Sequence, residues 1–220
     1  MQRVAELSEE QWGLVTRRQT QRLGVGWTSL SRLVDAGLLE RVDRGVYRIR
    51  GAFAPDHLAL RATWLQFEPD TPAWERFDDP NVAVVSHSSA AALYGVGDLR
   101  ADVHEFTVPV RRQSRRPDIR IHRGTVEDSD RLVLHGLPAT RAGRMIADLL
   151  ADHVDPTAVA QIIDEVLTHV YDYPGMVADK VAPFAARFGL RAGDGVGLLD
   201  HMLRLAGSPR REVLLEEARA

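Results

Sequence analysis

The segment that follows Thr16 constrains the fold most, because helix signals and strand signals alternate there at short, regular distances. Thr16 and Gln19 have the spacing of a capping box, in which each side chain bonds to the other residue's backbone N–H. This spacing predicts a helix that runs to about Leu23 and stops at Gly24. Before it, Ser8 followed by two acidic residues is typical of a helix N-cap and predicts a first helix that begins there.

A third helix is predicted shortly after this glycine. It begins at Thr28 or Ser29 and ends at Gly37, since glycine readily adopts the left-handed backbone that follows many helices. Its apolar residues recur at helical spacing and form one stripe, made of Leu30, Leu33 and Val34. Three short helices in close succession, the last two joined by a tight turn, are the arrangement of a helix-turn-helix.

Two short runs with β-strand character come directly after the third helix. They cover residues 38–42 and 46–49, and Asp43, Arg44 and Gly45 lie between them. Together they predict a β-hairpin in the position of a wing. We therefore predict that residues 1–50 form a winged helix-turn-helix that binds DNA. The alternative is a winged fold that serves only structure or dimerisation.

The predicted fold also indicates which side chains contact DNA. The third helix of such a domain enters the major groove with its N-terminal end foremost. With the apolar stripe turned inward, Arg32 faces outward and has the reach to read a guanine edge. Arg44, at the tip of the hairpin, is expected to reach phosphate or the minor groove. The predicted DNA-binding residues are Arg17, Arg18, Trp27, Thr28, Ser29, Arg32 and Arg44.

The remainder of the chain predicts a second domain after a connector. Residues 51–81 are interpreted as a connector with one helix, residues 57–67, and residues 82–220 as a C-terminal domain. In that domain, strand patterns at 82–85, 103–110, 119–122 and 132–138 are interspersed with helical patterns that open near Ser86, Thr140 and Asp155 and continue through the tail. The predicted class is α+β: a winged helix-turn-helix followed by a mixed α/β domain with a helical C-terminal tail.

Charge and composition agree with a nucleic-acid-binding end joined to another domain. Residues 1–50 carry nine Arg against six acids, and residues 145–220 carry seven bases against twelve acids. The absence of cysteine excludes disulfides and thiolate chemistry. Because no stretch has the length and apolar character of a signal peptide or a membrane span, we expect a cytoplasmic protein without a membrane partner.

An arginine-rich segment separates two strands of the predicted C-terminal domain. Its basic residues are Arg111, Arg112, Arg115 and Arg116. Guanidinium groups are planar and multidentate, so this segment suits contact with DNA phosphates, RNA or an acidic partner. The alternative is the solvated tip of a hairpin.

No complete catalytic or metal-binding motif is present in the sequence. Ser86, His87 and Ser88 lack the flanking glycines of a nucleophile elbow, and they are interpreted as a helix N-cap with His87 hydrogen-bonded locally. Pro117 and Asp118 resemble the start of a nuclease motif, but the acid-x-Lys that should follow is missing. None of the eight histidines forms a His-x-x-x-His or His-Glu-x-x-His pair. We therefore predict no enzymatic activity, no metal site and no cofactor.

Several short motifs, in this order and spacing, resemble the AbiEi-type antitoxins of bacterial type IV toxin–antitoxin systems, which take part in abortive infection. The resemblance spans residues 8–170. The matching segments are residues 23–25, 30–42, 44–48, 85–90, 93–95, 104–109 and 137–142. Relatives often have Ser and Arg where this chain has Gly26 and Trp27, so a common N-cap and a DNA-facing arginine are absent here.

The resemblance implies an antitoxin that represses its own operon by binding promoter DNA. Its partner would be a nucleotidyltransferase-like toxin, and the antitoxin need not form a stable complex with that toxin to counteract it. Residues 82–220 would be the antitoxin domain. The alternative is a stand-alone winged-helix transcriptional regulator that responds to a ligand.

Overall fold

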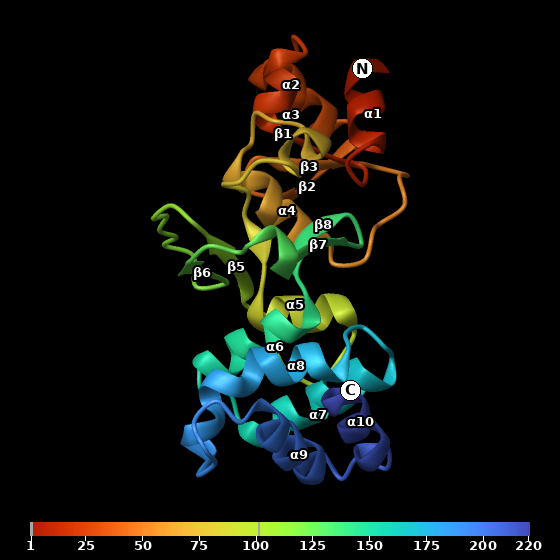
Figure 1. Cartoon of the computed structure of the whole chain (residues 1–220). Coiled ribbons are helices and arrows are strands. Elements are labelled where there is room, and N and C mark those ends of the chain that lie inside the picture. Colours follow the sequence, from red (N-terminus) through yellow and green to blue (C-terminus); the bar gives the residue numbers. More distant parts are fainter. Residues whose placement is uncertain (1, 101) are drawn as a thin grey trace. The chain divides into compact units, whose positions relative to one another are not determined.

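The computed structural model describes residues 2–100 and 102–220, which divide into two compact units. Unit 1 comprises residues 1–83 and unit 2 residues 84–220. Both contain helices and a β-sheet, so the chain is of mixed α+β type (Figure 1).

Unit 1 has a three-stranded antiparallel sheet in the order β1-β3-β2, with helices before, between and after its strands. The hairpin of β2 and β3 has an irregular register between Arg41 and Asp43, next to the turn. The elements, in chain order, are α1 (Gln2–Glu9), β1 (Leu14–Thr16), α2 (Arg17–Arg22), α3 (Trp27–Asp35), β2 (Leu39–Asp43), β3 (Val46–Ile49), α4 (Leu58–Phe67) and the 3₁₀ helix η1 (Ala73–Arg76).

The prediction that the first helix begins at Ser8 is wrong. Helix α1 precedes that residue and ends at Glu9, and the buried Ser8 hydroxyl donates to the Ala5 carbonyl inside the helix. Trp12 and Gly13 both have positive φ, which breaks the helical path. The chain then enters β1, whose three residues are buried and paired with β3. Pairing with a strand some thirty residues later therefore overrides the local capping signal.

The next two helices follow their sequence signals closely. Thr16 and Gln19 form the predicted capping box at the start of α2. Helix α3 begins slightly earlier than predicted, at Trp27, and its N-cap Gly26 supplies no side-chain hydrogen bond. Beyond its end, Gly37 has a φ of 71°, as expected for a glycine after a helix.

The core of unit 1 joins the helices to the sheet. Leu30 of α3 is buried together with Val4, Val15, Leu39 and Tyr47, and Leu33 and Val34 pack against this cluster. Since α3 has one apolar face, burying it leaves the opposite face in solvent.

The segment predicted as a connector forms part of unit 1. Helix α4 packs against β1, β2 and β3, and Trp64 on α4 is fully buried. The indole of Trp64 donates to the Ala83 carbonyl at 2.7 Å, and the buried Arg76 guanidinium lies 3.6 Å from its ring centroid. These contacts tie residues 58–83 to the sheet.

Unit 2 has a five-stranded mixed sheet in the order β6-β5-β4-β8-β7, with its last helices packed on one another (Figure 1). Helix α5 contacts β5 and α6, while α8 contacts both α6 and α9. The elements are β4 (Val84–Val85), α5 (His87–Tyr94), β5 (His104–Val108), β6 (Ile119–Arg123), η2 (Asp128–Asp130), β7 (Arg131–Leu134), β8 (Leu137–Thr140), α6 (Ala142–Ala151), α7 (Pro156–Thr168), α8 (Pro174–Val181), η3 (Ala182–Phe188), α9 (Gly195–Ala206) and α10 (Arg211–Arg219).

Two details of unit 2 differ from the sequence predictions. Thr140 does not open a helix, because it is the buried last residue of β8, and α6 begins at Ala142. Strands β5 and β6 pair in parallel, so the arginine-rich segment between them is a crossover and not the tip of a hairpin. The predicted cap of α7 is confirmed, since Asp155 accepts from two backbone N–H groups and Pro156 follows it.

No helix in the part of the chain that the structure describes combines the length and the apolar character needed to cross a membrane.

Candidate nucleic-acid interface

A basic cleft lies on unit 1, where the beginnings of α2 and α3 face the β2–β3 hairpin. It is lined by Arg17, Arg18, Trp27, Arg41, Arg44, Gly45, Val46, Tyr47, Gln66 and Pro69. Four of these side chains are arginines, and none of these lining residues is acidic. A cleft of this composition favours anions such as the phosphates of a nucleic acid.

Arg17 and Trp27 join the two helices at the edge of the cleft. The Arg17 guanidinium lies 4.8 Å from the centroid of the Trp27 ring, within cation–π distance. Trp27 is 56% exposed although it is a large aromatic residue, so most of its ring contributes little to the apolar core of unit 1. Together they present a planar cation and an aromatic face on one surface.

Arg18 and Arg22 are both paired with Asp70. The Arg18–Asp70 distance is 3.3 Å and the Arg22–Asp70 distance 3.4 Å, and both arginine side chains are 64% exposed. Exposed ion pairs of this kind contribute little to stability, so a phosphate can compete for either arginine. Within the described residues, by contrast, Arg17, Arg41 and Arg44 form no ion pair with a carboxylate.

Arg44 lies at the tip of the β2–β3 hairpin, and its side chain is exposed to solvent. The Arg44 backbone N–H donates to the Asp43 side chain at 2.6 Å, and Gly45 has a φ of 72°. This tight turn is built from backbone and Asp43, so the exposed Arg44 side chain does not contribute to it.

The outward face of α3 carries the other predicted DNA contacts. Thr28, Ser29 and Arg32 are exposed, opposite the buried Leu30. They do not line the cleft, which brings together Arg17, Arg18, Trp27 and Arg44 of the predicted set.

Arg41 lines the cleft but was not predicted from the sequence. It is exposed on β2 and lies opposite Tyr47 of β3. Its sequence position could have predicted this role, because Arg41 points outward in the strand pattern of residues 38–42 and lies close to Arg44 at the hairpin tip.

In unit 2, the arginine-rich segment is only partly free for a partner. Arg116 binds Asp118 through two bonds of 3.0 and 2.5 Å, which hold the pKa of that carboxyl below its usual value. Arg111 and Arg115 are exposed, and Arg112 is half-buried. The Asp118 carboxylate is therefore bound by Arg116, and this pair has a structural role.

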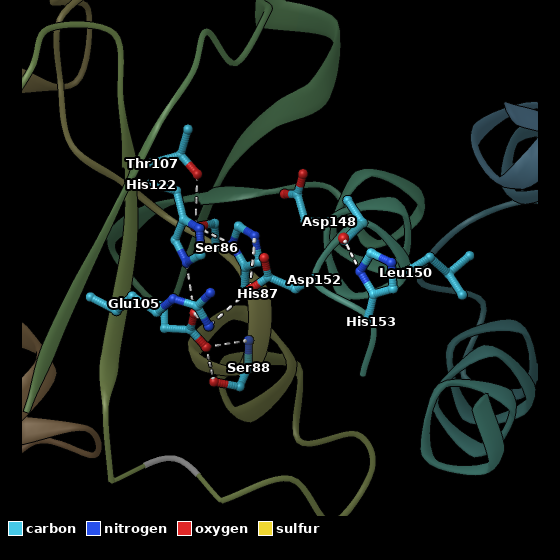
Figure 2. Close-up of polar contacts among 12 residues, drawn as sticks. Ser86, His87, Ser88, Glu105, Thr107, His122, Asp148, Leu150, Asp152 and His153 are labelled. Atoms are coloured by element: carbon cyan, nitrogen blue, oxygen red, sulfur yellow. Dashed lines mark hydrogen bonds and ion pairs between the residues drawn. The ribbon is translucent and has the colours of Figure 1, made fainter. Parts of the chain in front are cut away.

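A second polar cluster lies in unit 2 between α5, β5 and β6 (Figure 2). The rings of His87 and His122 are stacked with centroids 3.5 Å apart and an angle of 10° between their planes. His122 Nε2 lies 2.7 Å from a carboxylate oxygen of Glu105, while the other carboxylate oxygen accepts from the Ser88 hydroxyl. Ser86 binds the other side of His87, since its Oγ lies 2.9 Å from Nδ1.

This cluster alters the acidity of two of its members. Burial lowers the pKa of His87, and the neighbouring His122 lowers it further. Burial alone would raise the pKa of Glu105, but hydrogen bonds from His122 and Ser88 outweigh it and hold the pKa below its usual value. The local hydrogen bond predicted for His87 is present, whereas the Ser86 hydroxyl does not cap α5 and accepts from Thr107 instead.

Comparison with known proteins gives a family match and a similar solved structure. Residues 2–50 match the model of a protein family described as "Transcriptional regulator, AbiEi antitoxin". The structure of the RV2827C protein from Mycobacterium tuberculosis is similar, with a TM-score of 0.54 over 97% of this chain and 79% of that chain. At 17% identity, this likeness concerns the fold alone. No curated protein matches the chain at a significant level.

The family match covers α1 to β3, the elements that carry the exposed face of α3 and every residue of the basic cleft except Gln66 and Pro69. Over residues 2–50 the chain thus matches the AbiEi antitoxin family of transcriptional regulators, which confirms the resemblance for this part of the protein.

Proposed function

We propose that unit 1 is a winged helix-turn-helix that binds promoter DNA and represses the operon of the protein. Helices α2 and α3 are the helix-turn-helix, and the β2–β3 hairpin is the wing. The observation that carries the proposal is the basic cleft, which is lined by arginines from α2, β2 and the hairpin tip and by an exposed tryptophan at the start of α3.

The proposed contacts divide into two kinds. Arg17, Arg41 and Arg44 bind phosphates or the minor groove, where they add affinity without reading a sequence. Arg32, on the outward face of α3, reads base edges in the major groove together with Thr28 and Ser29.

Changing Arg32→Ala is expected to weaken operator binding and relax base preference. A bidentate arginine–guanine contact discriminates between bases by about 1–3 kcal/mol, and alanine cannot replace it. The measurement is selection from a randomised DNA library, followed by affinity for DNA upstream of the operon. Arg3→Ala is the control, because Arg3 is exposed on α1 and lies outside the cleft. Unchanged base preference in Arg32→Ala would show that α3 is not the reading helix.

We further propose that the protein is the antitoxin of a type IV toxin–antitoxin system and that unit 2 counteracts a nucleotidyltransferase-like toxin. The match of residues 2–50 to an antitoxin family supports an antitoxin role. The motifs of residues 85–142 that resemble such antitoxins lie in unit 2, within its sheet and the helices next to it. The exposed Arg111 and Arg115 are proposed contacts for the partner or for nucleic acid.

Neutralisation of the toxin is expected to survive the loss of DNA binding. The full chain with Arg17, Arg41 and Arg44 changed to Ala should rescue growth when it is expressed with the neighbouring toxin from an independent promoter. The reason is that these residues belong to unit 1, whereas the proposed antitoxin function belongs to unit 2. Failure to rescue, with normal protein levels, would mean that neutralisation requires the DNA-binding surface.

The alternative, a regulator that answers a small ligand, calls for a closed apolar pocket in unit 2. The groove near the start of α8 is lined in part by Val170, Tyr173 and Met176, which are 66%, 69% and 46% exposed. Such an open groove does not enclose a small molecule, because ligand sites bury most of their ligand. This groove therefore does not support the ligand-responsive alternative.

A further inference from the structure

We propose that His87, Glu105 and His122 bind a divalent transition-metal ion of the zinc class in unit 2. These three residues come from α5, β5 and β6, and their potential ligand atoms all lie within 4.8 Å of one another. Neither the basic cleft nor the proposed antitoxin function assigns a role to this cluster, so the inference stands independently of both.

The donor atoms lie close to the spacing that zinc requires. A tetrahedral zinc ion with bonds of about 2.1 Å holds its ligand atoms about 3.4 Å apart, so shifts of about one ångström are sufficient. His122 Nε2 and a Glu105 oxygen are already 2.7 Å apart and share a proton. The ion takes the place of that proton, which is released, and the stacked rings tilt until both nitrogen lone pairs meet at the ion.

Two of the three donors, His87 and Glu105, are each held by a hydrogen-bond partner outside the three. His87 Nδ1 is bound by Ser86 Oγ, which leaves Nε2 as its ligand atom, and Ser86 in turn accepts from Thr107. The second oxygen of Glu105 is bound by Ser88. Hydrogen-bonded partners of this kind fix the orientation of metal ligands in known sites.

A buried carboxylate next to the cluster provides independent support. Asp148 on α6 is 8% exposed; its Oδ1 accepts from Arg144, but its Oδ2 is buried and has no hydrogen-bond partner among the described residues. Figure 2 shows this carboxylate on the His87 side of the cluster, and its charge acts on the His87 ring. An unsatisfied buried carboxylate oxygen is costly, and a bound cation or its water ligand would satisfy it.

Asp152 and Arg120 complete the surroundings. Asp152 follows Asp148 by one helical turn, and its Oδ2 lies 4.0 Å from His87 Nε2, so it can act as a further ligand or bind a metal-bound water. The Arg120 guanidinium lies 2.9 Å from Asp152 and 3.8 Å from Glu105. Because its side chain is 58% exposed, Arg120 can turn into solvent when a metal cation arrives.

The donor set selects the class of metal. Two imidazoles and a carboxylate suit zinc and neighbouring transition metals, whereas magnesium and calcium prefer all-oxygen sites. Local sequence spacing gave no sign of this cluster, since its members are separated along the chain and only the β5–β6 pairing and α5 bring them together.

The test is calorimetric titration of the chelator-treated full chain with Zn²⁺ and with Mg²⁺, supported by the absorption spectrum of the Co²⁺ form. We expect one Zn²⁺ per chain, no Mg²⁺ binding, and a Co²⁺ spectrum typical of nitrogen and oxygen ligands. His122→Gln and Glu105→Gln should each weaken Zn²⁺ binding about 100-fold or more, since loss of a ligand costs at least as much as loss of its outer partner. Arg120→Gln should increase the affinity for Zn²⁺, because it removes a nearby positive charge.

His153→Gln is the matched control. His153 lies just after α6 and bonds locally to the Ala151 carbonyl, outside the cluster, so this change should leave Zn²⁺ affinity as in wild type. Circular dichroism of each metal-free variant verifies folding, and Arg120→Gln provides a gain that misfolding cannot imitate. Absence of saturable Zn²⁺ binding to wild type, or equal affinity in wild type and both ligand variants, would overturn the proposal.

Discussion

Changing Arg17, Arg41 and Arg44 together to alanine is expected to reduce operator affinity by about a thousandfold at 0.1 M salt, or about tenfold for each lost phosphate contact. These arginines line one cleft from α2, from β2 and from the turn between β2 and β3, and none is neutralised by an ion pair with a carboxylate in the described part of the chain. The slope of log K against log salt should fall by about 2.7, since each contact contributes about 0.9. The measurement is fluorescence anisotropy with operator and unrelated DNA across a salt series.

The matched control removes the same charge elsewhere. Arg3, Arg191 and Arg219 are exposed and do not line the cleft. Changing these three to alanine should alter affinity only through the net charge of the protein, a long-range effect that salt screens. If both triple variants lose the same affinity and salt slope, DNA binding depends on general charge and not on the cleft.

Trp64→Ala is expected to destabilise unit 1 by about 3–5 kcal/mol, the usual cost of emptying a buried tryptophan site. The indole is fully buried, donates to the Ala83 carbonyl and covers the Arg76 guanidinium. The substitution removes all three contributions, because it leaves a cavity, an unsatisfied carbonyl and a buried cation without its aromatic partner. For a unit of this size, the unfolding midpoint should fall by more than about 10 °C.

Thermal unfolding followed by circular dichroism tests this prediction. Trp74→Ala is the control, since Trp74 is 39% exposed and should cost far less. Trp64→Phe should be intermediate, because it retains an aromatic face for Arg76 but loses the hydrogen bond. A midpoint unchanged in Trp64→Ala would mean that α4 is not part of the cooperative core of unit 1, which would agree with the sequence prediction of a connector in residues 51–81.

Local signals predicted the elements whose backbone groups are satisfied within a few residues. The capping box of Thr16 and Gln19 formed as predicted, because both partners lie in the same helical turn. The stripe of α3 likewise placed Leu30 in the core and left Arg32 exposed. In each case the deciding interactions are short in sequence, so the residues themselves carry the information.

Tertiary pairing decided the elements for which local and distant partners compete. Ser8 has the sequence of an N-cap but ends up buried near the end of α1, because β1 pairs with β3 and the chain must turn at Trp12 and Gly13. Thr140 also has a helix-start signal, yet it closes β8, where it is paired with β7. Pairing in a sheet satisfies the backbone N–H and C=O groups and buries the side chain among the core residues, so it outweighs a single capping hydrogen bond.

The sequence by itself determined the helix pair, the hairpin and the basic, exposed residues of the proposed DNA surface, because amphipathic spacing and turn chemistry are local properties. Only the tertiary structure added Arg41 to that surface, made α4 part of unit 1 and brought His87, Glu105 and His122 together. These features depend on strand register and helix packing between distant segments. Such contacts are set by the burial of apolar area over the whole unit, and no short pattern in the sequence specifies them.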